Sequence, residues 1–326
     1  MNEADDYIPI FVDTIRVDTT VGCDLYLQNH IDGKVNYILY CSGSNAVKSD
    51  KIEELLRNNI NRLFIRKEEQ KKYLRYVESS LKHIINDDQI NNKEKAQLIY
   101  NVAKNIMVDI FEDPRSGEQV ERSKGWILNT VDFILKSKFA LPNMMSMISY
   151  DYYTYTHSVN VAVLGLYFSK HLGFKYDEMS VFGTGLLLHD IGKTQIEAEI
   201  INKREKLDQK EFTRIKMHVE LGVDILIEVG GIDSISFLPV MQHHEKCNGK
   251  GYPKGLKDSE IHKYGKIASI IDVYDALTTR RSYADARKPF LALKIMRDEM
   301  EGSFDAKFFR EFVFFLGSRG ENKNSN

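Results

Sequence analysis

The chain has 326 residues, which is long enough for two domains that each bury a hydrophobic core. Its residues are 43% hydrophobic and 28% charged, as in an ordinary globular protein. The formal net charge of −2 excludes a protein whose main task is to coat nucleic acid or an anionic membrane, so any anion must be bound by a local basic cluster. Three scattered cysteines exclude a disulfide scaffold and a thiolate zinc site.

The sequence contains no pattern typical of export or membrane insertion. Residues 1–6 are acidic where a signal peptide would be basic and then apolar. The densest apolar run, residues 159–166, is far shorter than the roughly 20 residues that cross a bilayer. We therefore expect a soluble protein in a reducing cytoplasm, with neither a membrane nor a polymeric nucleic acid as its partner.

Residues 1–88 are predicted to form a small α/β domain. Strand-like runs occur at residues 8–12, 25–27, 35–40 and 63–65, and a turn signal at residues 31–34 separates the second run from the third. Apolar residues recur at helical spacing over residues 52–60, and residues 68–85 form a second helical pattern. Nothing in this domain resembles a catalytic set, so we expect it to serve in regulation or dimerisation.

From about residue 91 to residue 316 the sequence has helical periodicity and little strand pattern. We therefore predict a mainly α fold with a helical domain at residues 89–316. The boundary is expected near residues 86–88 or within the long helix that follows. Residues 317–326 are polar and are predicted to form a disordered tail. Two apolar stripes at helical spacing support the helical assignment: Ala96, Ile99, Val102, Ala103, Ile106 and Met107, and Trp126, Ile127, Thr130, Val131 and Ile134.

Histidines and aspartates recur through the helical region at nearly even intervals. The steps between them are 32, 29, 25 and 28 residues, which suits one set of ligands on each helix of a bundle. Bundle cores are where metal sites are built, from side chains that project inward on facing helices. The series consists of His157, the pair His189-Asp190, His218, the pair His243-His244, and Asp272.

The local sequence directs these residues toward the interior. The pair His189-Asp190 follows an apolar run, and Gly222, one turn after His218, leaves room for a close neighbour. A single histidine on an apolar helix is more often a hydrogen-bonded core residue than a ligand, and a buried Asp272 is also explained by an arginine partner or by a role as a helix N-cap. Seven such residues together favour a metal site, because buried carboxylates are costly unless they are paired or metal-bound.

Imidazole and carboxylate ligands without thiolate suit iron, manganese, zinc, nickel or a similar divalent ion. Two ions are favoured over one, because the two oxygens of Asp190 can bridge a pair of cations. Two ions about 3.5–4 Å apart activate a bridging water and clamp an in-line displacement at phosphorus. The residue types therefore point to a hydrolase that acts on a phosphate ester.

Several short motifs resemble a known family. The run Leu188-His189-Asp190-Ile191-Gly192-Lys193 resembles the signature of HD-domain metal-dependent phosphohydrolases. Together with His243-His244-Glu245 and Gly251-Tyr252-Pro253 it resembles the HD-GYP subfamily, bacterial phosphodiesterases of cyclic di-GMP. The resemblance covers residues 145–315 and implies an all-helical HD-domain bundle, and residues 1–80 are more loosely similar to a small domain found ahead of HD-GYP domains.

The resemblance implies a role for each matching residue. Asp190 and Lys193 are expected to be catalytic, and Lys193 lies one helical turn beyond His189, where it would steady a phosphate oxygen or protonate the leaving ribose oxygen. Tyr153 stands where some members carry a glutamate associated with a third metal, so two ions are expected. The implied metal ligands are His157, His189, Asp190, His218, His243, His244 and Asp272.

Substrate binding is implied for Lys193, Gly251, Tyr252 and Arg281. Tyr252 is expected to stack on or hydrogen-bond the substrate; its alternative is a loop anchor. Arg281 is expected to pair with the phosphate that is not attacked, because a guanidinium gives bidentate contacts; its alternative is a salt bridge to Asp275 or Asp285. A basic rim that attracts a dianionic dinucleotide is predicted from Lys246, Lys250, Lys254, Lys257, Arg280 and Arg281.

The expected reaction is attack by a metal-bridging hydroxide at a binuclear site on cyclic di-GMP, which gives pGpG and then GMP. Asn248 and Ala284 replace an aspartate and a basic residue that are usual in the family, so a protein that senses cyclic di-GMP without cleaving it is one alternative. A phosphodiesterase of another cyclic dinucleotide, such as cyclic GMP-AMP, is the other. A homodimer or a signalling-protein partner is compatible with either.

Overall fold

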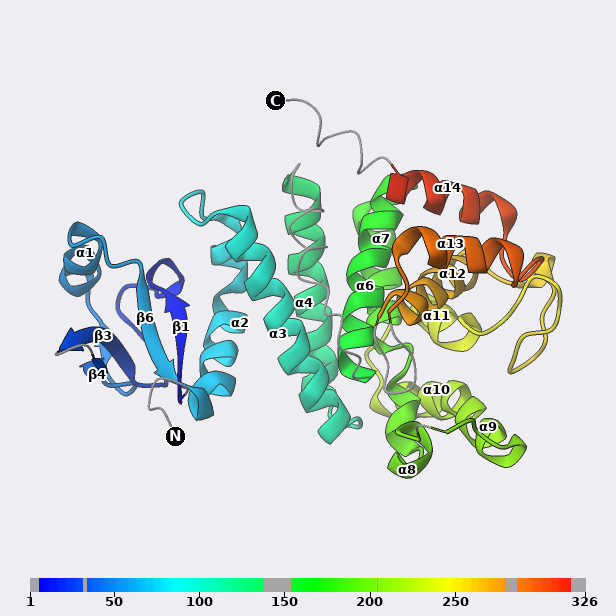
Figure 1. Cartoon of the computed structure of the whole chain (residues 1–326), viewed down its shortest axis with the longest axis horizontal. Coiled ribbons are helices and arrows are strands. Elements are labelled where there is room, and N and C mark those ends of the chain that lie inside the picture. The colour runs from blue at the N-terminus through cyan, green and yellow to red at the C-terminus, as the bar shows by residue number, and fades with distance from the viewer. Residues whose placement is uncertain (1–5, 32–33, 138–153, 204, 280–285, 318–326) are drawn as a thin grey trace. The chain divides into compact units, whose positions relative to one another are not determined.

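The structure is a computed structural model that describes residues 6–31, 34–137, 154–203, 205–279 and 286–317 (Figure 1). The chain divides into two compact units, residues 1–105 and 106–326, and the division lies inside helix α3 (Asn92–Glu112). The assignment of separate tasks to residues 1–88 and 89–316 stays a prediction. Of the predicted tail, residues 318–326 lie outside the described residues.

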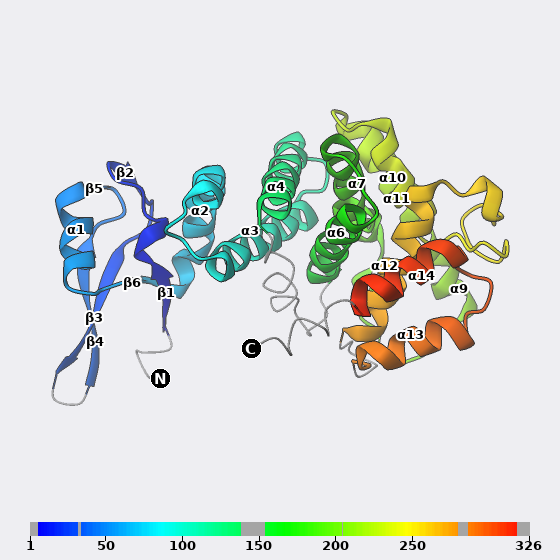
Figure 2. The same ribbon diagram turned by 90° about the horizontal axis from the view of Figure 1, so that it is seen from above.

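The first unit contains an antiparallel sheet of four strands in the order β1-β6-β3-β4 (Figure 2). The predicted strands and helices of this part are confirmed, and two additional strands of two residues each, β2 and β5, are too short to leave a sequence pattern. In chain order the elements are β1 (Tyr7–Phe11), β2 (Thr19–Thr20), β3 (Leu25–Ile31), β4 (Lys34–Cys41), β5 (Ala46–Val47), α1 (Ser49–Arg57), β6 (Arg62–Arg66) and α2 (Gln70–Asn86), followed by α3.

Strand β6 shows why this segment forms a half-buried sheet. Leu63 and Ile65 are fully buried, whereas Arg62 and Arg66 on the opposite face are exposed, as the two-residue period of a strand requires. Antiparallel pairing places Ile65 beside Ile8 of β1. One face of the sheet therefore contributes to the core of this unit, and the other carries polar and aromatic side chains.

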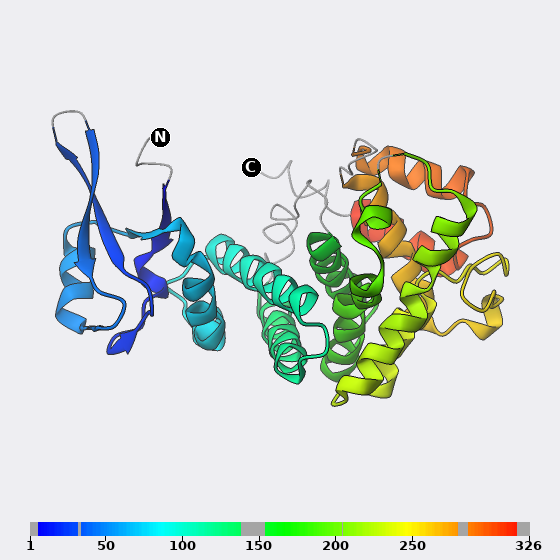
Figure 3. The ribbon, with the colours of Figure 1, turned by 90° about the horizontal axis from the view of Figure 1, so that it is seen from below.

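The second unit is helical, as the mainly α fold class predicts (Figure 3). Both predicted apolar stripes are buried. The helices of this unit after α3 are α4 (Gly117–Lys136), α6 (Thr154–His171), α7 (Tyr176–Leu188), α8 (Ala198–Ile201), α9 (Gln209–Lys216), α10 (His218–Val229), α11 (Phe237–Gln242), α12 (Lys263–Thr278), α13 (Pro289–Asp298) and α14 (Ala306–Gly317).

Helices α6 and α7 form the centre of this unit. Every residue of α6 from Thr156 to Ser169 is buried, which is typical of a helix that is surrounded by others. Gly165 lets α7 approach closely, because a Cβ at this position would lie 2.1 Å from Cδ1 of Leu186. Helix α7 also contacts α4 and α11, and α6 also contacts α12. The residues of the candidate site lie within α6 and α12, just after the ends of α7 and α11, and at the start of α10.

Among the residues that the structure describes, no helix is both long enough and apolar enough to cross a membrane.

The segment after α7 packs against the start of α10 with no room for a side chain. This segment is a short 3₁₀ helix, η4 (Ile191–Gln195). A Cβ on Gly192 would lie 1.9 Å from the carbonyl oxygen of His218 and 2.5 Å from the backbone nitrogen of Gly222. The sequence predicts that Gly222 leaves room for a close neighbour, and Gly192 is that neighbour.

We predict that Gly192→Ala lowers the melting temperature by about 2–12 °C. An added methyl group in a packed contact costs about 1–3 kcal/mol, and each kcal/mol shifts the melting temperature of a unit of this size by about 2–4 °C. Thermal unfolding followed by circular dichroism measures the change. Gly125→Ala in α4 is the control, because a Cβ there meets no atom within 4 Å and alanine favours a helix. Equal melting of the two variants would contradict the close packing.

Candidate metal centre

The seven predicted ligands come together in the core of the helical unit. His157 lies on α6, His189 and Asp190 follow the end of α7, and His218 begins α10. His243 and His244 follow the end of α11, and Asp272 lies in α12. Six of the seven are buried, and the side chain of His244 is 23% exposed. Residues that are far apart in sequence therefore share one polar site inside an apolar bundle.

The seven side chains form two groups in which the potential ligand atoms lie within 4.8 Å of one another. We call them group A (Asp190, His218, His243 and His244) and group B (His157, His189 and Asp272). Each group has histidine and carboxylate donors and no thiolate. Such a donor set suits a divalent metal ion.

The two carboxylates link the groups. Oδ1 of Asp190 lies 3.3 Å from Nε2 of His218 in group A, whereas Oδ2 lies 3.4 Å from Nε2 of His189 in group B. Asp272 does the same, with Oδ1 3.0 Å from Nε2 of His157 and Oδ2 3.7 Å from Nδ1 of His244. Each carboxylate thus directs one oxygen to each group, which is the arrangement of a bridging ligand.

Local structure fixes which ring nitrogen faces the cluster. Nδ1 of His189 donates a hydrogen bond to the carbonyl oxygen of Leu186 at 2.7 Å. Nδ1 of His218 likewise donates to Ile215, at 2.6 Å, and Nδ1 of His243 donates to carbonyl oxygens of its own helix. Because a carbonyl oxygen only accepts, these Nδ1 atoms carry the proton and the Nε2 atoms keep a lone pair.

Burial keeps the histidines neutral. It lowers the pKa of His189 to about 4 and that of His218 to about 3. It also lowers the pKa of His243 and, further, that of His244. A neutral imidazole is the form that binds a metal, so these four rings are ready to act as ligands at neutral pH.

The two aspartates are held as carboxylates. Burial by itself would raise the pKa of Asp190, but the Lys193 ammonium opposes this effect, and the pKa of Asp190 lies well below its usual range. The pKa of Asp272 also lies well below its usual range, because its close contacts with His157 and His244 outweigh burial, which by itself would raise this pKa. The site therefore presents negative charge to a cation.

Two buried atoms of the cluster lack a hydrogen-bond partner within the described part of the chain. They are Nε2 of His189 and Oδ1 of Asp190. Unpaired buried polar atoms cost free energy, and native proteins rarely leave them so. A divalent cation in the cluster would satisfy both atoms at once, so the residues present fit a metal.

Lys193 lies at the edge of the cluster. The sequence predicts that it continues the helix of His189, but α7 ends at Leu188 and Lys193 belongs to the 3₁₀ helix η4. Its ammonium still reaches the site and donates a hydrogen bond to Oδ2 of Asp190 at 2.5 Å. The side chain is 17% exposed, so it borders on both the cluster and solvent.

Two further carboxylates support the cluster and were not predicted from the sequence. Oδ2 of Asp275 accepts a hydrogen bond from Nδ1 of His157 at 2.7 Å and so directs Nε2 of this ring into the cluster. Metal-binding histidines commonly donate to such a carboxylate. The sequence contains a signal for this role: Asp275 lies one turn after Asp272 on α12, so both carboxylates are on the same face of the helix. The other is Glu245, next to the histidine pair in sequence.

Glu245 holds the GYP loop, by which we mean residues 246–257. This buried carboxylate accepts hydrogen bonds from the backbone N–H groups of Lys254, at 2.7 Å, and Leu256, at 2.9 Å. Gly251 lets the loop fold back on its own start, because a Cβ there would lie 2.4 Å from the backbone nitrogen of Lys246. The predicted substrate-binding residue Gly251 therefore has a clear packing role.

Tyr252 covers the partly exposed side of the cluster. Its ring stacks on the imidazole of His244, with 4.6 Å between centroids and 27° between planes, and its edge faces His218 at 6.5 Å. Burial raises the pKa of Tyr252, so its phenol stays a hydrogen-bond donor. The sequence predicts contact with the substrate and offers a loop anchor as the alternative; the ring contact with His244 puts Tyr252 beside the cluster in either case.

Asn248 forms a hydrogen bond within the GYP loop. Its side-chain oxygen accepts a hydrogen bond from the backbone N–H of Lys250 at 3.1 Å, as a carboxylate at this position would. Four lysines of the predicted basic rim form no ion pair within the described part of the chain: Lys246, Lys250, Lys254 and Lys257. The positions named from the sequence that lie outside the described residues are Tyr153, Arg280, Arg281, Ala284 and Asp285.

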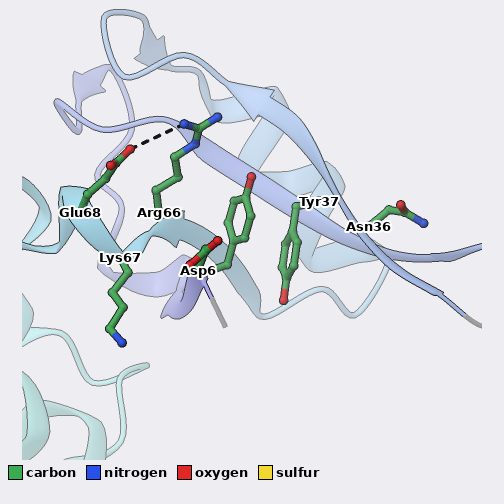
Figure 4. Close-up of a pocket in the computed structure, with 7 residues that line it drawn as sticks. Asp6, Asn36, Tyr37, Arg66, Lys67 and Glu68 are labelled. Carbon is green, nitrogen blue, oxygen red and sulfur yellow. Dashed lines mark ion pairs between the residues drawn. The ribbon is translucent and has the colours of Figure 1, made fainter. Parts of the chain in front are cut away.

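A separate pocket of about 730 Å³ lies in the first unit (Figure 4). Tyr7 and Tyr37 stack beside it with 3.9 Å between ring centroids, and Arg66 pairs with Glu68 at 3.6 Å. Its lining includes two acidic and two basic residues, so its charge gives no preference for an anionic substrate. None of the seven cluster residues lines this pocket.

The family model described as HD domain matches residues 156–308, a span that contains all seven cluster residues and the GYP loop. A cyclic di-GMP phosphodiesterase of Pseudomonas aeruginosa is 33% identical over 226 residues, which are 68% of this chain and 54% of that protein. A 3'3'-cGAMP-specific phosphodiesterase of Vibrio cholerae is 31% identical over 157 residues, 48% of this chain and 34% of that protein. The chain thus spans about half, or less, of the length of these curated relatives.

A solved structure has the same fold over nearly the whole chain. It is Bd1817, a HDG"Y"P protein from Bdellovibrio bacteriovorus, with a TM-score of 0.65 and 20% sequence identity. The similarity covers 96% of this chain and 100% of that chain. Both the small sheet-containing part and the helical bundle therefore have a precedent in one protein.

We predict that Asp275→Ala weakens metal affinity about 10- to 100-fold, as is usual when the partner of a metal-binding histidine is removed. The loss arises because Nδ1–H of His157 no longer has a carboxylate to fix the ring. Asp275→Asn keeps an acceptor oxygen and is expected to lose less. Competition with a chelator of known affinity measures the change for Mn²⁺.

Asp298→Ala serves as the control for this prediction, because this carboxylate lies on α13 and pairs only with the adjacent Arg297 in the described structure. Affinity in the control is expected to match the unmodified protein. If Asp275→Ala bound Mn²⁺ as tightly as the control, Asp275 would have no positioning role.

Proposed function

Because this chain belongs to the HD domain family and its helical unit contains an HD-GYP domain, we propose that it is a metal-dependent phosphodiesterase that hydrolyses cyclic di-GMP. The product would be linear pGpG and, after a second cleavage, GMP. The observation that carries the proposal is the pair of ligand groups joined by Asp190 and Asp272. Two groups with two shared carboxylates suit two cations better than one.

In this proposal each group holds one divalent ion, with iron or manganese as the first candidates. Group A contributes three imidazoles and group B two, and the aspartates serve both. When bound, such a pair of ions supplies an activated water and neutralises charge on a phosphodiester. The residues leave the identity of the ion open, because imidazole and carboxylate also accept zinc or nickel.

The residues of the chain supply the remaining chemistry. Hydrolysis forms a bond from the oxygen of water to phosphorus and breaks the bond to the ribose 3′ oxygen, which must receive a proton. Lys193 is the proposed donor, because its ammonium reaches the Asp190 carboxylate and its side chain is partly exposed. General acid catalysis by a positioned group contributes about 10²- to 10⁴-fold.

Tyr252 and the loop lysines are proposed to bind the substrate. The Tyr252 ring lies on the partly exposed His244, so a ligand that reaches the cluster from solvent meets this tyrosine. The exposed Lys250, Lys254 and Lys257 supply a local positive rim on a chain whose formal net charge is −2. Arg281 keeps its predicted role as a ligand of the second phosphate, as part of the proposal.

The curated relatives support a cyclic dinucleotide as the substrate class, and their names include both cyclic di-GMP and 3'3'-cGAMP phosphodiesterases. Cyclic di-GMP is favoured because the relative with that name aligns over the larger share of this chain. The alternative of a sensor that does not cleave is disfavoured, because all seven ligands are present and lie together. A regulatory or dimerising role for the first unit remains part of the proposal.

We predict that the protein, loaded anaerobically with iron or with manganese, binds two ions per chain and converts cyclic di-GMP to pGpG. Asp190→Ala is expected to retain less than one ion and to lose at least about 100-fold in kcat, the scale of losing a main electrostatic contribution to catalysis. Elemental analysis and chromatography of the nucleotides measure the two results.

Asp224→Ala on the exposed side of α10 is the matched control and is expected to keep both metal and activity. Absence of turnover in either metal form, with two ions bound, would refute the proposed reaction. A single ion bound per chain at saturation would refute the binuclear site.

We predict that kcat/KM for cyclic di-GMP exceeds that for 3'3'-cyclic GMP-AMP by about 10-fold or more, which corresponds to about 1.4 kcal/mol of preference. Mixed-substrate assays in one reaction measure the ratio directly. A ratio below one would assign the chain to the alternative cyclic dinucleotide. Comparable turnover of a mononucleotide would exclude a dinucleotide-specific site.

A further inference from the structure

A second cavity adjoins the metal centre on the side of helices α8 and α9. It has a volume of about 690 Å³, within the range of pockets that enclose small ligands. Five of its ten lining residues are apolar, the others are two lysines, two acidic residues and Gln209, and none of them belongs to the cluster. The apolar part of the lining consists of Ile200, Ile201, Leu207, Phe212 and Ile215.

Two residues connect this cavity to the metal centre. Ile215 lines the cavity and also accepts, through its carbonyl oxygen, the hydrogen bond from Nδ1 of His218. Phe212 lines the cavity and faces Tyr252 edge-on, with 6.5 Å between ring centroids and 78° between planes. Since Tyr252 stacks on His244, an aromatic path runs from the cavity wall to the metal ligands.

The ring of Phe212 is partly exposed to solvent and lines the cavity. The residue is 41% exposed and lies on α9, a helix of eight residues. A flat exposed ring against a cavity is the feature on which nucleobases stack in proteins that bind single nucleotides or strands.

Lys216 supplies a positive charge at the same place. Its ammonium lies 4.6 Å from the centroid of Phe212 and 5.2 Å from that of Tyr252. Within the part of the chain that the structure describes, this ammonium forms no ion pair, whereas the nearby Lys203 is paired with Glu211 at 2.5 Å. Lys216 is therefore a cation beside Phe212 and Tyr252 that can contact an anionic ligand.

We propose that Phe212 and Lys216 form a subsite for one nucleotide half of the substrate: the purine base enters the α8–α9 cavity against Phe212, and Lys216 contacts a phosphate. The proposal rests on the function proposed above and names the residues that recognise the half of the dinucleotide that is not cleaved first. A cyclic dinucleotide has two purines and two phosphates, and a metal cluster by itself contacts only the phosphate under attack.

The subsite gives a physical reason why a dinucleotide would bind more tightly than a phosphodiester without a purine. A simple phosphodiester without a purine would use the metal centre alone and gain nothing from the cavity. Stacking of a base on an aromatic side chain contributes about 1–3 kcal/mol, which is enough to favour a dinucleotide over such an ester by about 5- to 100-fold. Phe212 and Lys216 are positioned to supply this difference in binding, without a role in proton transfer.

The test compares Phe212→Ala and Lys216→Ala with the unmodified full chain loaded with manganese. Affinity is measured by calorimetry with a hydrolysis-resistant phosphorothioate analogue of cyclic di-GMP. Phe212→Ala is expected to weaken binding about 5- to 100-fold, and Lys216→Ala about 2- to 5-fold, the scale of one exposed charge contact. Phe212→Trp keeps a stacking surface and is expected to restore binding to within about 3-fold.

Kinetics give a second readout. With cyclic di-GMP, the loss in Phe212→Ala is expected mainly in KM. With bis(p-nitrophenyl) phosphate, which has a phosphodiester and no purine, the loss in kcat/KM is expected to be at least about 5-fold smaller than with cyclic di-GMP, since base stacking does not contribute. Metal content and the melting temperature of each variant show that the cluster and the fold are intact.

Lys210→Ala is the matched control, because Lys210 lies on the same helix, is exposed and does not line the cavity. It is expected to bind the analogue like the unmodified chain. If Phe212→Ala and Lys210→Ala bind alike while the unmodified chain cleaves cyclic di-GMP, the subsite is refuted and the proposed function stands. If the unmodified chain cleaves bis(p-nitrophenyl) phosphate but neither binds nor cleaves cyclic di-GMP, the proposed function is refuted as well.

Discussion

The helical unit depends on the burial of two carboxylates, Asp190 and Asp272, at a point where its central helices meet. Moving a charged carboxylate out of water is expensive unless opposite charge compensates it. The surrounding imidazoles are neutral because burial lowers their pKa values, so they offer lone pairs and little charge. The Lys193 ammonium contacts Asp190, and a divalent cation would provide further positive charge.

The backbone fixes the positions of the side chains that surround the two buried carboxylates. Most of the cluster residues lie at helix ends, where a side chain can point into the core while the helix axis passes beside it. Hydrogen bonds from Nδ1 of His189 and His218 to carbonyl oxygens three residues earlier fix the ligating nitrogen. The contact between Gly192 and the start of α10 then sets how closely two of these ends approach. The site is therefore held by packing before any ligand binds.

A layer of aromatic rings separates the cluster from the α8–α9 cavity. Tyr252 contacts metal-ligand candidates on one side and Phe212 on the other, and Lys216 lies near both rings. On a chain of nearly balanced charge, such local placement of a cation and aromatic surface decides where an anionic ligand binds. The same arrangement links the proposed chemistry at phosphorus to recognition of a base.

The sequence by itself determined the helical fold class and the seven candidate ligands, because helical periodicity is local and only a few residue types bind metals. Tertiary structure decided how these residues combine. It directs one oxygen of Asp272 to each ligand group, brings Asp275 to Nδ1 of His157, and sets Phe212 against Tyr252. These contacts join residues on different helices or loops, and their geometry follows from packing angles and glycine contacts that no local pattern encodes.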